Sequence, residues 1–344
     1  MSHAALQFTS STRVLSFNTV ERPKITSEDH VLIRVAFAGI CGTDLHIIHG
    51  EYPSKQGTFA LGHEFSGVVD SVGAAVKHVK PGDHVAVDPN ISCGVCDSCR
   101  NAACHYCKSN DAIGVFQDGG WAQFCVVPQN LVYRLPDSMP LEHGALCEPM
   151  SCVAHGWNKL AGVPHSSRVL ILGAGIIGNL WACMFHMHGH RGNVTISEPQ
   201  AARRHLVLAL DLGYEVTTPD ELARRDPQFD LVVDCSGSAA AMQKAFTWLN
   251  MGGRLMVFGV ANPKATIAIS PYDVMKKELS IIGALVNPHT FIEAVALVEM
   301  MGQRYLDYKR LGVKTFPLEA HEEAMNELEA GSIAKAVFDV LATK

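Results

Sequence analysis

Four cysteines follow one another closely in the first half of the chain. Cys93, Cys96, Cys99 and Cys107 are spaced C-x2-C-x2-C-x7-C. Structural zinc is held by four ligands in a tetrahedron, and thiolates from a single loop can supply all of them. The spacing therefore predicts a closed, structural zinc site; the alternatives are an iron–sulfur cluster or unliganded thiols. A fifth cysteine inside the loop, Cys104, could replace one of its neighbours.

A glycine-rich turn follows an apolar run in the second half. Val169–Leu172 leads into Gly173-Ala174-Gly175-Ile176-Ile177-Gly178, and a helical pattern comes next. The three glycines would permit a tight turn, admit a pyrophosphate close to the backbone, and let the helix pack on the strand. The helix N-terminus offers free N–H groups to the phosphates. The motif predicts dinucleotide binding, with an ordinary strand-to-helix turn as the alternative.

An acidic residue stands where this motif needs one. Glu198 ends the next apolar run, about 20 residues beyond Gly178. A carboxylate there accepts hydrogen bonds from the ribose hydroxyls and repels a 2′-phosphate, which favours NAD over NADP. Arg203 and Arg204 lie nearby and leave NADP as the alternative.

Other possible metal ligands are dispersed along the chain. Cys41, His63 and one glutamate, Glu64 or Glu148, could supply the three ligands of a catalytic zinc with one exchangeable position. By spacing alone they are as well explained as core residues, because lone cysteines are usually buried. The remaining cysteines are most simply small buried hydrophobes, namely Cys125, Cys147, Cys152, Cys183 and Cys235.

Two regions with different patterns must position these residues. Up to about residue 150, short runs such as Val31–Ala38, Phe65–Val72 and His84–Val87 are separated by Gly and Pro, which predicts an irregular β domain. From about residue 154, apolar strands alternate with helices, as in a parallel sheet covered on both faces. Strands are expected at 168–172, 193–197, 229–234, 254–259 and 279–284, and helices at 177–188, 200–212 and 238–250. The tail, 288–344, reads helix, strand, helix, strand.

Composition narrows the classes of protein. A chain of 344 residues, 48% of them hydrophobic, suggests two domains at about 150 residues each. A net charge of −6 argues against a nucleic-acid partner, and no apolar run approaches the roughly 20 residues of a membrane span. Residues 1–17 lack the pattern of a secretory signal. We therefore expect a cytoplasmic protein whose eleven cysteines bind metal or lie buried.

Together these motifs resemble the zinc-dependent medium-chain alcohol and polyol dehydrogenases, the group that contains sorbitol dehydrogenase. The resemblance spans essentially the whole chain. Its carriers are Gly39–His46 (GICGTDLH), Gly62–Gly67 (GHEFSG), the Cys93–Cys107 loop, Glu148–Cys152 (EPMSC) and the Rossmann glycines. It implies an α/β fold, with a doubly wound Rossmann sheet and a GroES-like irregular β-barrel catalytic domain. The expected limits are 1–153 and 287–344 for the catalytic domain and 154–286 for the NAD-binding domain.

The resemblance assigns metal-site roles residue by residue. Cys41 and His63 match ligands of the catalytic zinc. Glu64 matches a glutamate that can bind the metal directly in this family. Glu148 matches the polyol-branch glutamate, which ligates zinc or holds its water. Asp44 would orient His63.

It also implies a proton path and a cofactor site. Thr43 matches the hydroxyl residue at the start of the path, and His46 matches the outer relay. The residues that match cofactor contacts are Gly173, Gly175, Ile177, Gly178, Glu198, Arg203, Val260 and Leu285.

The implied activity is reversible oxidation of a secondary hydroxyl of a polyol to a ketose, with NAD as hydride acceptor and one catalytic and one structural zinc ion. Ile47 stands where sorbitol dehydrogenase has a tyrosine that touches the polyol, so the pocket differs from that enzyme's. Asn287–Phe291 looks more like pentitol and arabinitol dehydrogenases. The alternatives are a 2,3-butanediol or threonine dehydrogenase and, from another class, a recruited structural protein of the crystallin kind. A homo-oligomer, dimer or tetramer, is expected.

Overall fold

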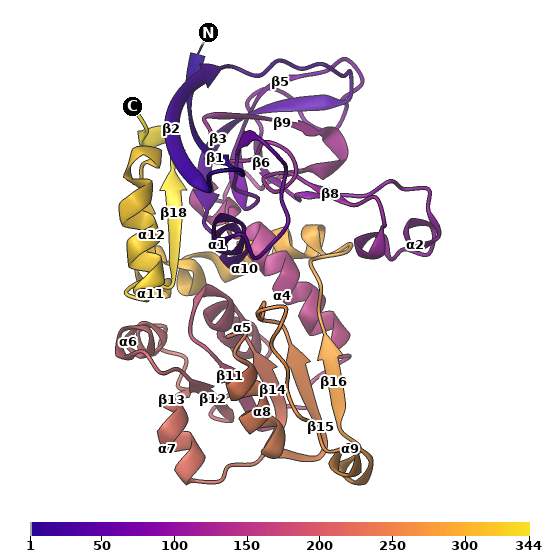
Figure 1. Cartoon of the computed structure of the whole chain (residues 1–344), viewed down its shortest axis with the longest axis vertical. Helices are drawn as coiled ribbons and strands as arrows, with labels where there is room; N and C mark the ends of the chain where they lie inside the picture. The colour runs from indigo at the N-terminus through magenta and orange to yellow at the C-terminus, as the bar shows by residue number, and fades with distance from the viewer. Residues whose placement is uncertain (1) are drawn as a thin grey trace.

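A seven-stranded sheet forms the centre of the upper lobe in Figure 1. The computed structural model describes residues 2–344, and this sheet has the order β10-β6-β5-β3-β18-β17, with β9 also paired to β3. All three strand runs predicted in the first region are confirmed. The strands are β3 (His30–Gly39), β5 (Phe65–Val72), β6 (His84–Val87), β9 (Phe124–Pro128), β10 (Val132–Arg134), β17 (Val313–Phe316) and β18 (Lys335–Asp339).

Smaller elements complete this lobe. One sheet has the order β2-β1-β4, and a two-stranded ribbon joins β7 to β8. The loop with the four cysteines carries α2 and extends away from the body of the molecule (Figure 1). The bounds are β1 (Ser2–Thr9), β2 (Val14–Glu21), α1 (Gly42–His49), β4 (Thr58–Ala60), β7 (Asn90–Ile91), α2 (Asp97–Arg100), β8 (Asp111–Ala112) and α3 (Leu141–Gly144).

The tail of the chain returns to the lobe in which the chain begins. Strand β18 pairs antiparallel with β3, placing Val337 opposite Gly39. The expected order of helix, strand, helix, strand is confirmed, with one more short helix, α11, before the first strand. The helices are α10 (Phe291–Leu306), α11 (Tyr308–Leu311) and α12 (His321–Glu329).

The lower lobe is a six-stranded sheet in which all neighbouring strands run parallel. Its order, β13-β12-β11-β14-β15-β16, is that of the doubly wound dinucleotide fold. In such a sheet the ligand lies at the carboxyl ends of the strands, where the order reverses. The strands are β11 (Val169–Leu172), β12 (Val194–Ser197), β13 (Glu215–Thr217), β14 (Phe229–Asp234), β15 (Leu249–Val257) and β16 (Ser280–Gly283).

Two helices of the lower lobe end earlier than the sequence indicates. The helix expected at 238–250 ends at Thr247, because β15 begins at Leu249 rather than at 254. The helix expected at 200–212 ends at Ala209, and the chain then turns through left-handed Asp211. The helices are α5 (Ile176–Met187), α6 (Ala201–Ala209), α7 (Pro219–Arg224), α8 (Ala239–Thr247) and α9 (Pro271–Lys277).

Helix α4 (Cys147–Lys159) runs between the two lobes and packs against α10 (Figure 1). Its buried face belongs to the same apolar core as β11, α5 and α10.

We keep 1–153, 154–286 and 287–344 as proposed domain limits. Among residues 2–344, no helix combines the length and the apolar character needed to cross a membrane.

Candidate active site and metal centres

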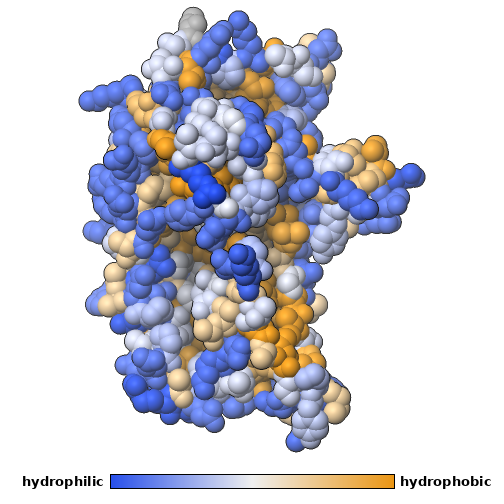
Figure 2. Space-filling model, viewed as in Figure 1, coloured by the Kyte–Doolittle hydropathy of each residue, from blue (hydrophilic) through white to orange (hydrophobic). Residues whose placement is uncertain are grey.

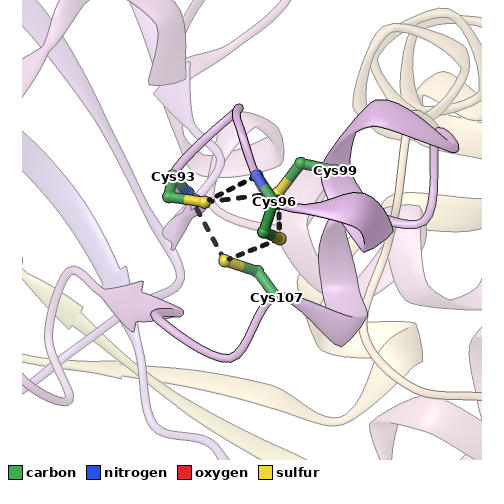
Figure 3. A group of neighbouring side chains, drawn as sticks. All are labelled: Cys93, Cys96, Cys99 and Cys107. Carbon is green, nitrogen blue, oxygen red and sulfur yellow. Dashed lines mark hydrogen bonds between the residues drawn. The ribbon is translucent and has the colours of Figure 1, made fainter.

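The four thiols of the cysteine loop point toward one another (Figure 3). Sγ–Sγ distances are 3.5 Å for Cys96–Cys99 and 3.9 Å for both Cys93–Cys99 and Cys96–Cys107. Zinc–sulfur bonds of about 2.3 Å in a tetrahedron would separate the sulfurs by about 3.8 Å. The donor set therefore fits a structural zinc ion.

A second, mixed group lies deeper in the same lobe. Ligand atoms of Cys41, His63 and Glu64 are all within 4.8 Å of one another. Cys41 is the N-cap of α1, and the other two residues lie between β4 and β5. His63 and Glu64 are buried. One thiolate, one imidazole and one carboxylate are a donor set that suits a catalytic zinc with an open position.

Asp44 orients this group. Its Oδ2 accepts the backbone N–H of Cys41 at 2.8 Å, and its Oδ1 lies 3.3 Å from His63 Nδ1. Burial by itself would lower the pKa of His63, but the Asp44 carboxylate and the Cys41 thiol together raise it well above its usual value. With Nδ1 directed at Asp44, the other ring nitrogen is left for a metal.

Lys335 is part of the site and was missed by the sequence reasoning. Its ammonium pairs with Glu64 Oε2, and both side chains are almost wholly buried. Its Nζ also donates to the carbonyl of Ile40 at 3.2 Å. The available signal was a lone lysine in the otherwise apolar run Ala334–Phe338. The pairing occupies one oxygen of Glu64 and leaves the other for a metal.

Glu148 lies outside the group formed by Cys41, His63 and Glu64 but faces the same interior. It stands in the first turn of α4, where burial raises the pKa of its carboxyl to about 7. The charges of His63 and Glu64 act on it, the first lowering and the second raising its pKa. The thiol of Cys152, one turn later, donates to its Oε1 at 3.6 Å. This carboxyl is therefore a polar group held in an apolar wall beside the metal ligands.

The expected proton path lies on α1. Thr43 and His46 are three residues apart and share one face of the helix. His46 Nδ1 lies 2.6 Å from Glu51 Oε2, at a partly exposed position. Among residues 2–344, no hydrogen bond joins Thr43 to His46.

Ile47, the position at which sorbitol dehydrogenase has a tyrosine, is buried in the core of the lobe, with 2% of its surface exposed.

The glycine turn has the geometry that a dinucleotide needs. Gly173 has a φ of +96°, a left-handed conformation that favours glycine. A Cβ on Gly175, the N-cap of α5, would meet no atom within 4 Å, so a ligand can reach the backbone there. A Cβ on Gly178 would lie 2.1 Å from the carbonyl oxygen of Gly173. Ile177 stands in the first turn of α5, which follows directly.

Glu198 closes the turn from the next strand. Its Oε2 accepts the N–H of Ala174 and its Oε1 that of Gln200, each at 2.8 Å. A carboxylate has about four acceptor positions, so two remain for ribose hydroxyls. Arg204 donates to the carbonyls of Glu198 and Pro199. Arg203 donates instead to the carbonyl of Leu328 in α12, at 3.4 Å.

Val260 and Leu285 follow β15 and β16 at the carboxyl ends of the parallel strands. Their side chains are 58% and 52% exposed. Two apolar side chains exposed at this edge of the sheet are suited to contact a planar nicotinamide ring.

Comparisons with known proteins agree with this geometry. Residues 27–137 match the alcohol dehydrogenase GroES-like domain and residues 177–300 the zinc-binding dehydrogenase domain. D-altritol 5-dehydrogenase of Agrobacterium fabrum is 34% identical over 280 residues, which cover 80% of this chain and 82% of that protein. D-arabinitol dehydrogenase 1 of Uromyces fabae is 29% identical over 329 residues, 90% of each chain.

Among solved structures, one described as a zinc-binding dehydrogenase of Sinorhizobium meliloti 1021 bound to NADP has a TM-score of 0.90 and 30% identity. It covers 98% of this chain and 99% of that one. The chain belongs to the zinc-dependent medium-chain alcohol and polyol dehydrogenases. It is an oxidoreductase of the zinc-binding dehydrogenase family, with a Rossmann and a GroES-like domain, as the sequence predicts.

Proposed function

We propose that this enzyme reversibly oxidises a secondary hydroxyl of a linear polyol to a ketose, with hydride transfer to NAD. The proposal rests on the group formed by Cys41, His63 and Glu64, together with the buried carboxyl of Glu148 beside that group. A zinc ion held by these residues would supply the Lewis acidity that lowers the pKa of a bound alcohol, and NAD would be the hydride acceptor.

The chain's own residues prepare the site for that chemistry. Cys41, His63 and the free oxygen of Glu64 would hold the metal, with Asp44 and Lys335 fixing their orientation. Thr43 would relay the hydroxyl proton by accepting it and giving up its own, through the cofactor ribose, to His46, whose Nδ1 lies 2.6 Å from Glu51 Oε2. Burial of the ligands excludes water from the reacting centre, which strengthens the electrostatic interactions inside it.

The substrate class rests on Glu148. A buried carboxyl with a pKa of about 7 can donate or accept a hydrogen bond, so it can pair with a second hydroxyl of the substrate. A simple alcohol would leave it unpaired, and such unpaired groups cause strong discrimination. The similar proteins named for D-altritol and D-arabinitol support a polyol substrate.

The choice of NAD rests on Glu198. Its carboxylate stands at the end of β12, where a 2′-phosphate would be repelled. The two nearby arginines are both engaged by backbone carbonyls. The similar structure from Sinorhizobium meliloti is bound to NADP, so cofactor preference has to be measured directly.

The test is a panel of pentitols, hexitols, 2,3-butanediol, threonine and ethanol, assayed with NAD and with NADP on protein whose zinc content is known. We expect the highest kcat/KM with a pentitol or hexitol and NAD. A higher kcat/KM with 2,3-butanediol or threonine would instead identify the protein as a butanediol or threonine dehydrogenase with the same fold. Absence of turnover with every alcohol of the panel, in protein that contains zinc, would contradict the proposed polyol activity and favour the recruited structural protein.

We also propose a homo-oligomer that forms through the edge of the parallel sheet. β16 is the last strand in the sheet order, so one of its edges is free. Apolar side chains are exposed around it, namely Met251, Tyr272, Met275 and Ile281, and Figure 2 shows an apolar area low on the right, where Figure 1 has β16 and α9. Free edges and apolar patches mark pairing surfaces. Ile281→Lys should shift the mass measured by sedimentation toward the monomer.

A cytoplasmic location is proposed from the cysteines. All eleven are free thiols in the structure. Disulfides are characteristic of oxidising compartments and rare in the cytosol. Fractionation of cells that express the protein, followed by thiol labelling, tests this proposal.

A further inference from the structure

A buried amide side chain stands between the two lobes, shortly after the last strand of the parallel sheet. Asn287 is 1% exposed. Its Nδ2 donates to Ser151 Oγ at 2.6 Å and to Asp88 Oδ1 at 3.4 Å. Its Oδ1 accepts from Asn90 Nδ2 at 2.7 Å. Both hydrogens and the oxygen of this amide are therefore used in a buried network, which fixes its position.

The partners of Asn287 belong to separate parts of the molecule. Ser151 lies on α4, and its hydroxyl also donates to the carbonyl of Glu148 at 2.6 Å. Asp88 and Asn90 follow β6 in the lobe that carries the metal ligands. Asp88 accepts from both the backbone and the side chain of Asn90. One side chain thus ties the segment that follows β16 to α4, the helix that bears Glu148, and to the first lobe.

The same segment has two more anchors. Thr290 Oγ1 donates to the carbonyl of Ser151 at 2.8 Å. His289 Nε2 donates to the carbonyl of Ala102, in the four-cysteine loop, at 3.1 Å, and it lies 3.8 Å from Cys104 Sγ. These contacts join the segment to α4 a second time and to the loop of the structural metal.

The backbone between the anchors is held in an unfavourable conformation. Val286 has a φ of +45° and His289 a φ of +60°. The left-handed region is rare for non-glycine residues and especially so for a β-branched valine. Such conformations persist only where the surroundings over-determine them, and they cluster at functional sites. The hydrogen bonds of Asn287 and Thr290 supply that constraint on either side of Pro288.

The constrained segment begins where the cofactor must lie. Leu285 is half exposed at the carboxyl end of the sheet, and that edge holds the dinucleotide in this fold. Only Val286 separates it from Asn287, so a displacement of the buried amide moves Leu285 as well. A misplacement of about 1 Å at the reacting atoms can reduce the rate about a hundredfold.

We propose that Asn287 is a positioning residue for hydride transfer, which fixes residues 284–286 against the nicotinamide and, through Ser151, against the helix that bears Glu148. The proposal rests on the dehydrogenase reaction of the proposed function, whichever alcohol proves to be the substrate. It predicts a loss in the chemical step with cofactor affinity largely retained.

The test uses Asn287→Ala in the zinc-loaded enzyme, with the best substrate from the panel. We expect kcat to fall at least tenfold and the dissociation constant of NAD to change less than threefold. The primary deuterium isotope effect on kcat should rise, because hydride transfer becomes rate-limiting. Without cofactor, hydrogen–deuterium exchange of the amides of residues 284–290, apart from Pro288, should accelerate, which is a readout independent of turnover.

Asn250→Ala is the matched control. Asn250 Nδ2 donates to Asp230 Oδ1 at 2.7 Å, at the amino ends of β15 and β14, the end of the sheet away from the carboxyl-end edge. This variant should alter neither the isotope effect nor exchange at 284–290. If Asn287→Ala shows the same isotope effect and the same exchange at 284–290 as Asn250→Ala, the proposal is overturned. A wild-type enzyme without activity would instead refute the proposed function.

Two milder variants cover the case in which Asn287→Ala does not fold. His289→Ala removes an exposed anchor, and Ser151→Ala removes one hydroxyl from the network. Each should lower kcat at least threefold and raise the isotope effect. Wild-type kcat and isotope effects in both would overturn the proposal.

Discussion

The ammonium group of Lys335 and the carboxylate of Glu64 form an ion pair with side chains only 1% and 2% exposed. Glu64 belongs to the candidate metal group, and Lys335 is contributed by β18 near the other end of the chain. The pair engages one of the two carboxylate oxygens of Glu64. It also means that the C-terminal segment takes part in shaping the site.

Lys335→Met should destabilise the protein strongly. Removing one partner of a buried ion pair leaves an uncompensated charge, at a cost of about 3–5 kcal/mol in the free energy of unfolding. Urea denaturation measures this loss, and the double variant with Glu64→Gln should recover part of it. Lys314→Met is the control, because Lys314 pairs with Glu323 and Glu327 at the surface and its removal should change little. Equal stability of the two lysine variants would contradict the prediction.

The two metal groups should respond differently to mutation. We expect two zinc ions per chain by metal analysis. Cys41→Ser should remove one of them and abolish turnover while the melting temperature stays near that of the wild type. Cys96→Ser should remove the other and lower the melting temperature, because the 93–107 loop loses its cross-link. A single zinc in fully active protein would refute the two-site prediction.

Glu198→Gln should shift cofactor preference toward NADP. The substitution removes the negative charge that repels a 2′-phosphate but keeps an acceptor for the N–H of Ala174 or Gln200. A hydrogen bond to a charged group contributes roughly 1.5–3 kcal/mol, so the kcat/KM ratio of NAD to NADP should fall by about ten- to a hundredfold. If the wild type already prefers NADP, Glu198 does not bind the ribose, and Arg203 or Arg204 must contact the phosphate.

Glu148→Cys should show whether that carboxyl binds the metal or pairs with a hydroxyl of the substrate. A thiolate can still serve a nearby zinc, so metal content should be retained. Polyol kcat/KM should fall more than activity on a simple secondary alcohol, because a hydroxyl of the polyol loses its partner. Equal losses on both substrates would show that Glu148 serves the metal alone.

The sequence predicts well whatever is encoded locally. The strand at 229–234, the glycine turn before α5 and the spacing of the four cysteines depend on neighbouring residues, and each is found where expected. Helix ends are predicted less accurately. Trp248 and Leu249 fit either a helix or a strand, and the pairing of Leu249 with Phe229 decides for the strand. The local sequence pattern cannot show whether such residues continue the helix or pair with a distant strand.

Long-range contacts in the site could not be predicted from spacing. Lys335 reaches the carbonyl of Ile40 across 295 residues of sequence. Asn287 likewise meets Asp88 and Ser151 only because the fold places β16, β6 and α4 together. A buried lysine or asparagine looks in sequence like any surface residue, since its partners are set by the topology.

The position of β18 between β3 and β17 also orders events during synthesis. Until β18 has been made, Phe37–Gly39 of β3 keep an open edge with unpaired N–H and C=O groups, although β9 already covers His30–Arg34. The six strands of the parallel sheet are by then available to fold. Domains generally fold as units as the chain emerges, the N-terminal one first. We therefore expect the first lobe to be completed only when β18 emerges, so that until then the nascent chain keeps a short unprotected sheet edge in its metal-binding half.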